Sequence, residues 1–171
     1  MLRQIDRAIL GLNRLLLIVA LAAMSVIVFA NVMLRYTTGD SIVWAEEVAR
    51  YLMIWLAYLG IGPVLRLGGH MAIDTLQAGL GEPRAKLLRL LIVLLMACFS
   101  AAMVWIGVDF VDRTSVQSTP VTDISFSWIA AAIPVGFALN LWHLLAVARG
   151  YVTDREFEVS ADLDPDQAAS I

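Results

Sequence analysis

The chain has 171 residues, of which 60% are hydrophobic and only 16% are charged, and its formal net charge is −3 at pH 7. Soluble domains contain about 45–50% apolar and about 25% charged residues, so this composition excludes a soluble globular domain and indicates an integral membrane protein. The single cysteine, Cys98, excludes an intrachain disulfide and a CxxC redox pair. No basic patch with interleaved aromatic residues is present in the sequence, so nucleic acid is not an expected partner.

Four segments are long and apolar enough to cross a bilayer. A helix that spans a hydrocarbon core of about 30 Å needs about 20 mostly apolar residues, which predicts transmembrane helices over about residues 12–35, 42–66, 87–109 and 124–148. We therefore expect an all-α integral membrane protein with a single four-helix transmembrane domain over residues 1–150. The tail 151–171, in which six carboxylates accompany one arginine, is expected to be disordered.

Lysine and arginine residues are distributed unevenly over the connections between these helices. Cytoplasmic loops of membrane proteins carry an excess of both. The other side of the predicted domain holds Arg35 and Arg113, if Arg50 within or near the second helix is set aside. Both termini are therefore predicted to lie in the cytoplasm. The nine residues on the predicted cytoplasmic side are Arg3, Arg7, Arg14, Arg66, Arg84, Lys86, Arg89, Arg149 and Arg155.

The connections also carry local signals. The short segment 36–44, with a turn at Gly39, predicts that the first two helices form an antiparallel hairpin. Pro63 and its neighbouring glycines are expected to weaken the end of the second helix. Apolar residues at loose helical spacing over 71–80 predict a short amphipathic interfacial helix after it. Pro134 predicts a kink in the fourth helix.

Several charged residues lie at the predicted outer end of the first hairpin. Glu46 and Glu47 are four and three residues before Arg50, so either pair can meet on a helix, and Asn31 and Arg35 lie at the same level of the first helix. Ionisable residues at membrane depth need partners, so we favour a cluster of opposite charges that joins the hairpin or a partner's helix. The alternatives are that a glutamate carries a proton or binds a cation, or that the cluster contacts a soluble partner.

His70 and Asp74 are also four residues apart, just after the second span. A metal site there lacks further ligands, because His143 is the only other histidine, and a pair of haem-ligating histidines would have to face each other across the bundle. An interfacial hydrogen bond or a helix cap is the preferred interpretation, and no cofactor is expected. The sequence contains no nucleotide-binding loop, HExxH or GxSxG motif, which argues against an enzyme.

Four stretches occur in the order found in one family of transport proteins: NVMLRY (31–36), SIVWAEEVARYLMIW (41–55), GGHMAID (68–74) and TPVTDISFSWIAAAIPVGF (119–137). With the four-span layout, they resemble the small membrane subunit (the Q subunit, DctQ type) of tripartite ATP-independent periplasmic (TRAP) transporters. The WAEE sequence, followed by an arginine and an aromatic-rich helix, is the most specific of these features.

The resemblance implies a non-catalytic, multi-pass subunit of the bacterial inner membrane. In such systems a large multi-span membrane subunit (M type) moves the substrate by a sodium-driven elevator motion. A periplasmic binding protein (P type) delivers an organic acid, such as a dicarboxylate or sialic acid. The small subunit is expected to be a scaffold for the large one and to contact membrane lipids. A stand-alone four-helix transporter and the small subunit of another tripartite carboxylate transporter are the alternatives. The candidate structural or partner-interface residues are Asn31, Arg35, Trp44, Glu46, Glu47, Arg50, Trp55, His70, Asp74 and Pro134.

Overall fold

The computed structural model describes residues 2–66 and 81–154. Its elements are α1 (Leu2–Thr38), α2 (Ala45–Arg66), α4 (Glu82–Thr114), α5 (Ser127–Ala130) and α6 (Ala132–Asp154). Four helices are long and apolar enough to cross a membrane, with α5 and α6 forming one span, so the prediction of an all-α protein with four spans is confirmed. The predicted amphipathic helix, His70, Asp74 and most of the acidic tail lie outside the described residues.

Helices α1, α4 and α6 extend beyond the predicted spans, whereas α2 begins at Ala45, three residues later than predicted. The 37 residues of α1 and the 33 residues of α4 correspond to lengths of about 55 and 50 Å, more than a bilayer core requires. The predicted spans end near charged residues, whereas the backbone hydrogen bonds of a helix can continue past such residues into polar surroundings. Helix α4 begins directly after Gly81, with Pro83 in its first turn, where the missing proline N–H is tolerated. Helix α6 continues to Asp154, past the predicted domain boundary at residue 150.

Two prolines lie within the second and fourth spans and have different effects. The fourth span is interrupted at Ala131, between α5 and α6. Pro134 lies in the first turn of α6; it has no N–H to donate to the Ala130 carbonyl, and its ring would clash with that carbonyl in a continuous helix. The sequence predicted a kink at Pro134; the structure has the interruption at Ala131, three residues before it. Helix α2, by contrast, continues through Pro63 to Arg66.

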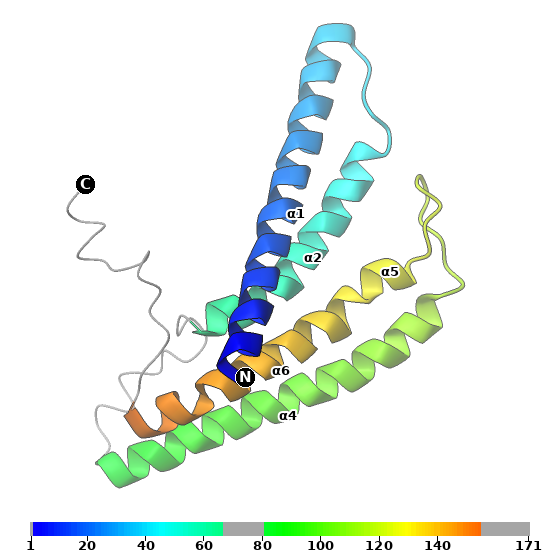
Figure 1. Cartoon of the computed structure of the whole chain (residues 1–171). Helices are drawn as coiled ribbons and strands as arrows, with labels where there is room; N and C mark the ends of the chain where they lie inside the picture. Colours follow the sequence, from blue (N-terminus) through cyan, green and yellow to red (C-terminus); the bar gives the residue numbers. More distant parts are fainter. Residues whose placement is uncertain (1, 67–80, 155–171) are drawn as a thin grey trace, which may run out of the picture.

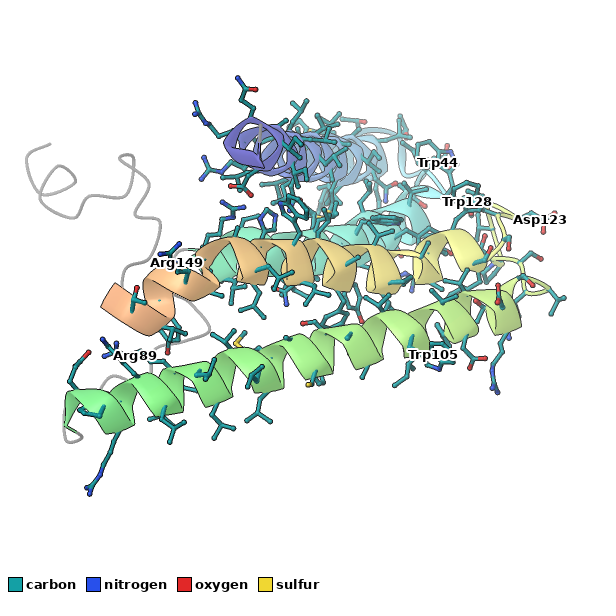
Figure 2. All side chains as sticks on the ribbon, turned by 60° about the horizontal axis from the view of Figure 1, so that its bottom comes forward. Trp44, Arg89, Trp105, Asp123, Trp128 and Arg149 are labelled. Carbon is teal, nitrogen blue, oxygen red and sulfur yellow. The ribbon has the colours of Figure 1, made fainter. Side chains whose placement is uncertain are left out.

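The helices form a layer rather than a four-sided bundle. Helix α1 packs along α2, α2 along α6, and α6 along α4, while α1 and α4 lie at the two edges (Figure 1). We call the side that holds the 39–44 and 115–126 connections the hairpin side. The opposite side, which holds the beginning of α1 and α4 and the end of α6, is the terminal side. Figure 2 shows Trp44, Trp128 and Asp123 toward the hairpin side and Arg89 and Arg149 toward the terminal side.

Small residues mark the closest approaches within the layer. A Cβ atom added to Gly136 on α6 would lie 2.6 Å from the Cβ of Tyr58 on α2. Gly62 on α2 faces the His143 ring in the same way, and Gly107 on α4 faces the first turn of α6. Such residues let helix backbones approach closely in lipid. Helix α6 is therefore the most tightly packed of the spans, whereas only 6% of the apolar window of α1 is buried.

Candidate functional site

The first buried polar cluster lies on the hairpin side and is built around Glu47. This residue is in the first turn of α2, where a negative charge is favourable, and it is only 2% exposed. Its carboxylate accepts hydrogen bonds from the backbone N–H groups of Val121 (3.0 Å) and Thr122 (3.1 Å) and from the Thr122 hydroxyl (2.6 Å). Glu47 therefore fixes the connection between α4 and α5 to the beginning of α2.

The α4–α5 connection is shaped to present those donors. The Thr119 N–H donates to the Ile124 carbonyl (2.9 Å), and the Phe126 N–H donates to the Gln117 carbonyl (2.8 Å), so the segment folds back on itself. Asp123, at its tip, has a φ of 52°, in the left-handed region that Asp and Asn enter more readily than most residues. The turn directs two successive N–H groups at one carboxylate, an arrangement that binds an anion well.

Asn31 holds the other connection on this side. It is buried on α1, and its Oδ1 accepts a hydrogen bond from the Ile42 N–H (2.7 Å). Gly39 follows the end of α1 with a φ of 81°, and its N–H donates to the Arg35 carbonyl (3.1 Å), which is the usual geometry of a glycine that ends a helix. The predicted hairpin turn is confirmed, and Asn31 rather than a salt bridge fastens it.

The expected cluster of opposite charges does not form. Among the described residues, neither Arg35 nor Arg50 forms an ion pair with Glu46 or Glu47. Glu47 turns inward to the α4–α5 connection, whereas both arginines and Glu46 are exposed. The prediction that Arg50 neutralises a glutamate was therefore wrong, because the backbone donors of residues 121 and 122 bind Glu47 instead.

Two further candidates on this side are tryptophans. Trp44 is exposed directly before α2, and Trp55 is partly buried on α2, about three helical turns deeper. Tryptophan side chains are favourable at the membrane–water interface. Neither side chain takes part in the Glu47 hydrogen bonds.

The second cluster lies on the terminal side around Arg66, at the end of α2. The guanidinium is 2% exposed and forms two hydrogen bonds with the Asp6 carboxylate on α1, one of them from Nη1 to Oδ2 at 2.9 Å. Its Nε–H donates to Nδ1 of His143 on α6 (2.7 Å). The Trp142 indole N–H donates to the same Asp6 carboxylate (3.1 Å). Arg66 thus joins α1, α2 and α6.

His143 is engaged at both ring nitrogens. Nδ1 accepts from Arg66, and the Asn13 amide lies 3.3 Å from Nε2. Because a neutral imidazole that accepts at Nδ1 carries its proton at Nε2, that proton is donated to the Asn13 Oδ1 once the amide is turned by 180°. Oδ1 has no other hydrogen-bond partner among the described residues. This environment does not suit a haem ligand, since neither nitrogen is free, and it agrees with the hydrogen-bond interpretation.

The sequence patterns do not single out Asp6, Asn13 or Arg66 as site residues. A signal was present, since all three and His143 were expected near the cytoplasmic ends of their helices and hence at one level. Charge alone did not show that Asp6 would face Arg66, because the two are 60 residues apart. Among the described residues, no three His, Cys, Asp or Glu side chains converge as metal ligands. The two clusters join helices to one another.

The fold and these clusters define a multi-pass membrane protein whose buried polar groups stabilise its own helix layer. Residues 24–153 match the family model of the tripartite ATP-independent periplasmic transporters, DctQ component. The chain therefore belongs to this family of small TRAP transporter permease subunits.

Individual relatives agree with this assignment. The chain is 32% identical over 125 residues (71% of its length) to the C4-dicarboxylate TRAP transporter small permease protein of Rhodobacter capsulatus, covering 55% of that protein. It is 25% identical over 163 residues (93% of its length) to the ectoine TRAP transporter small permease protein of Halomonas elongata, covering 83% of it. It is also 28% identical over 119 residues (70%) to the sialic acid TRAP transporter permease protein of Haemophilus influenzae, covering only 19% of that protein.

We expect Glu47→Gln to destabilise the protein. An amide offers one acceptor oxygen where the carboxylate offers two, and its NH₂ group would face a backbone N–H or the Thr122 hydroxyl, leaving a donor unpaired. The thermal unfolding midpoint in detergent should fall, and the 115–126 connection should become sensitive to protease. Glu46→Gln, at an exposed neighbouring position, is the control and should behave as wild type. Equal midpoints for the two variants would contradict the assigned role of Glu47.

We also expect Asp6→Asn to be strongly destabilising, because it leaves the buried Arg66 guanidinium without its counter-charge. Breaking a buried ion pair costs on the order of 3 kcal/mol, whereas the exposed pair between Arg113 and Asp109 (2.8 Å) should contribute close to nothing. The free energy of unfolding should therefore fall in Asp6→Asn and stay unchanged in Asp109→Asn. A similar loss in both variants would show that burial of Arg66 does not matter.

Proposed function

We propose that this chain is the non-catalytic scaffold of a TRAP transporter, bound to a large multi-span membrane subunit that carries out sodium-coupled uptake of an organic acid. The observation that carries the proposal is that the buried charged side chains bind other parts of this same chain. Among the described residues, the buried charged side chains are Glu47, Arg66 and Arg89. Each is bound to another part of the same chain; the Arg89 guanidinium donates to the Val152 carbonyl (3.3 Å) and lies 3.5 Å from Glu82.

A transport site would need different chemistry. A carboxylate that carries a proton or a cation through the membrane must alternate between partners and be accessible from a pathway. Glu47 is instead enclosed by three donors of the 119–122 segment. A stand-alone transporter is therefore less well supported than a scaffold, and family membership favours the TRAP system over another tripartite carboxylate transporter.

The sialic acid permease of Haemophilus influenzae supports a larger partner. The segment similar to this chain makes up only 19% of that protein, so in that permease a region like this one is continuous with a much longer polypeptide. We infer that here the corresponding long polypeptide is a separate M-type subunit, and that a P-type periplasmic protein delivers the substrate to the pair. The relatives' names support an organic acid as the substrate, since they include C4-dicarboxylate, sialic acid and ectoine transporters.

The proposal includes an orientation. Arg89 and Arg149 lie on the terminal side and Trp44 and Trp128 on the hairpin side (Figure 2), and cytoplasmic ends are enriched in Lys and Arg. We therefore place both termini in the cytoplasm of a bacterial inner membrane and the Glu47 cluster at the periplasmic face.

Affinity purification from native membranes tests the proposal. The tagged chain, extracted in mild detergent, should recover a many-span membrane protein in roughly equal amount, identified by mass spectrometry. A tagged membrane protein of unrelated family, expressed at the same level, is the control and should not recover it. Recovery of this chain alone, folded and monodisperse, would contradict the scaffold role.

A further inference from the structure

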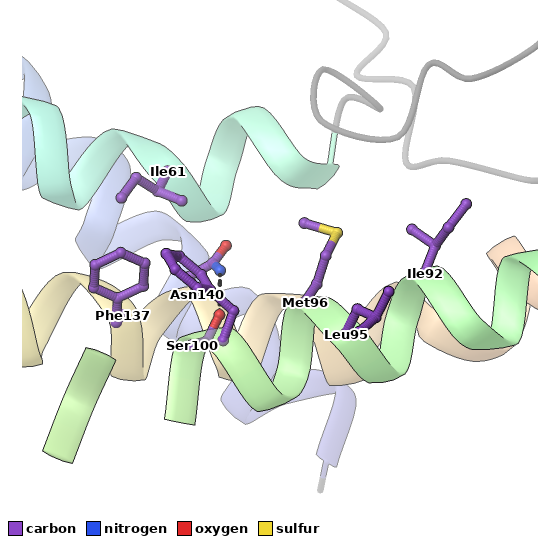
Figure 3. A pocket seen from close by; sticks show the side chains of 8 residues that line it. Ile61, Ile92, Leu95, Met96, Ser100, Phe137 and Asn140 are labelled. Carbon is purple, nitrogen blue, oxygen red and sulfur yellow. Dashed lines mark hydrogen bonds between the residues drawn. The ribbon is translucent and has the colours of Figure 1, made fainter. Parts of the chain in front are cut away.

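A groove opens between α2 and α4 on one face of the helix layer. Helix α6 forms its floor, and its walls come from the two helices on either side, which do not pack along each other. The groove has a volume of about 510 Å³ and is largely apolar, with Ile61 from α2, Met96 from α4 and Phe137 from α6 among its lining residues (Figure 3).

Two buried polar residues, Asn140 and Ser100, interrupt this apolar lining. Asn140 on α6 is 3% exposed, and its Nδ2 donates to the Ser100 hydroxyl on α4 (3.0 Å). Its Oδ1 has no hydrogen-bond partner among the described residues. In Figure 3 the amide lies between Phe137 and Met96, with its oxygen turned toward α2. The groove is therefore apolar except for this hydrogen-bonded pair, whose unpaired acceptor lies in its floor.

The depth of this acceptor in the membrane limits what can cover it. Asn140 lies at the middle of the span Ser127–Thr153, where water is scarce and an unpaired polar group costs free energy. A lipid acyl chain would fill the apolar walls but has no hydrogen to donate. A transmembrane helix with a hydrogen-bonding side chain supplies both the apolar surface and the donor.

The packing geometry fits the same occupant. Helices α2 and α4 flank α6 without packing along each other, so one further helix can lie between them on this face of the layer. The wall residues on α4 have the spacing of one helix face: Ile92, Leu95, Met96, Phe99 and Ser100.

We propose that this groove receives one transmembrane helix of the large membrane subunit, with a hydrogen-bond donor of that helix bound to Asn140. The inference rests on the proposed function and adds to it the contact face and the chemistry of the contact. The Glu47 and Arg66 clusters, which hold α2 in place, then position one wall of the groove.

Photo-crosslinking from α4 tests the contact face. A benzoylphenylalanine is placed at Met96 or Phe99, inside the groove, and at Leu94 or Ala101 as matched controls on the opposite face of the same helix. In the full complex, both groove positions should crosslink to the large subunit and both control positions should not. Crosslinks only from the control positions would overturn the inference, as would a product of two copies of this chain or no protein product from the groove.

A substitution of Asn140 separates docking from folding. Asn140→Leu combined with Ser100→Ala removes the unpaired acceptor and replaces both partners of the buried hydrogen bond by apolar groups, so the isolated chain should unfold at about the same temperature. Its recovery of the large subunit should fall about three- to twentyfold, the range expected for one hydrogen bond within a membrane, whereas Leu94→Ala should recover it normally. Lower stability of the isolated chain with undiminished recovery would overturn the inference.

The outcomes also distinguish this inference from the proposed function. Recovery of the large subunit by the wild-type chain, with crosslinks from the wrong face of α4, rejects the groove and leaves the scaffold role in place. Failure of the wild-type chain to recover any large subunit rejects both.

Discussion

Helix α2 is held at both of its ends by a buried charged side chain, and the rest of the layer is arranged around it. On the hairpin side, Glu47 binds the connection between α4 and α5. On the terminal side, Arg66 binds Asp6 on α1 and His143 on α6. Because the two contacts lie at opposite ends of one helix, they fix its position along α6 as well as its rotation. Apolar contacts alone would fix the position and rotation of α2 less well, because one apolar side chain can take the place of its neighbour in such contacts.

The layer arrangement has consequences for what the protein can do. Four helices in a row have two open faces, and much of their apolar surface stays exposed within this chain. The inner helices α2 and α6 approach closely at Gly62 and Gly136, whereas α1 contributes little to the core. A layer whose inner helices pack closely is suited to a scaffold for a larger membrane protein, because it offers a large contact area on its open faces.

Much of the fold follows from local sequence signals. Hydropathy predicted the four spans and Gly39 the hairpin turn, because each depends on a few neighbouring residues. The partners of Glu47 were not predictable in this way: Thr122 lies 75 residues away, and its contribution is partly a backbone N–H that any residue offers. The same holds for Asp6 and Arg66, because these two charges lie on different helices, α1 and α2, that had to be brought to one level.

The structure also joins two of the four stretches that carried the family resemblance. The stretch 41–55 contains Glu47, and the stretch 119–137 contains the turn that binds it. The Glu47 carboxylate and the loop whose N–H groups bind it form one structural unit. The arginine within the first stretch, Arg50, suggested an ion pair, yet it is exposed and outside this unit.

The central claim is that this chain is a static scaffold, and a distance measurement across its layer tests it most directly. Spin labels are attached at Tyr36→Cys, at the end of α1, and Val116→Cys, just after α4; both sites are exposed, and the exposed Cys98 is replaced by alanine. The distance distribution is then recorded in the assembled transporter by pulsed electron paramagnetic resonance. We expect one narrow distribution that does not change when sodium and substrate are added. A distribution that shifts by several ångströms during transport would show that the layer itself moves, and would contradict the account.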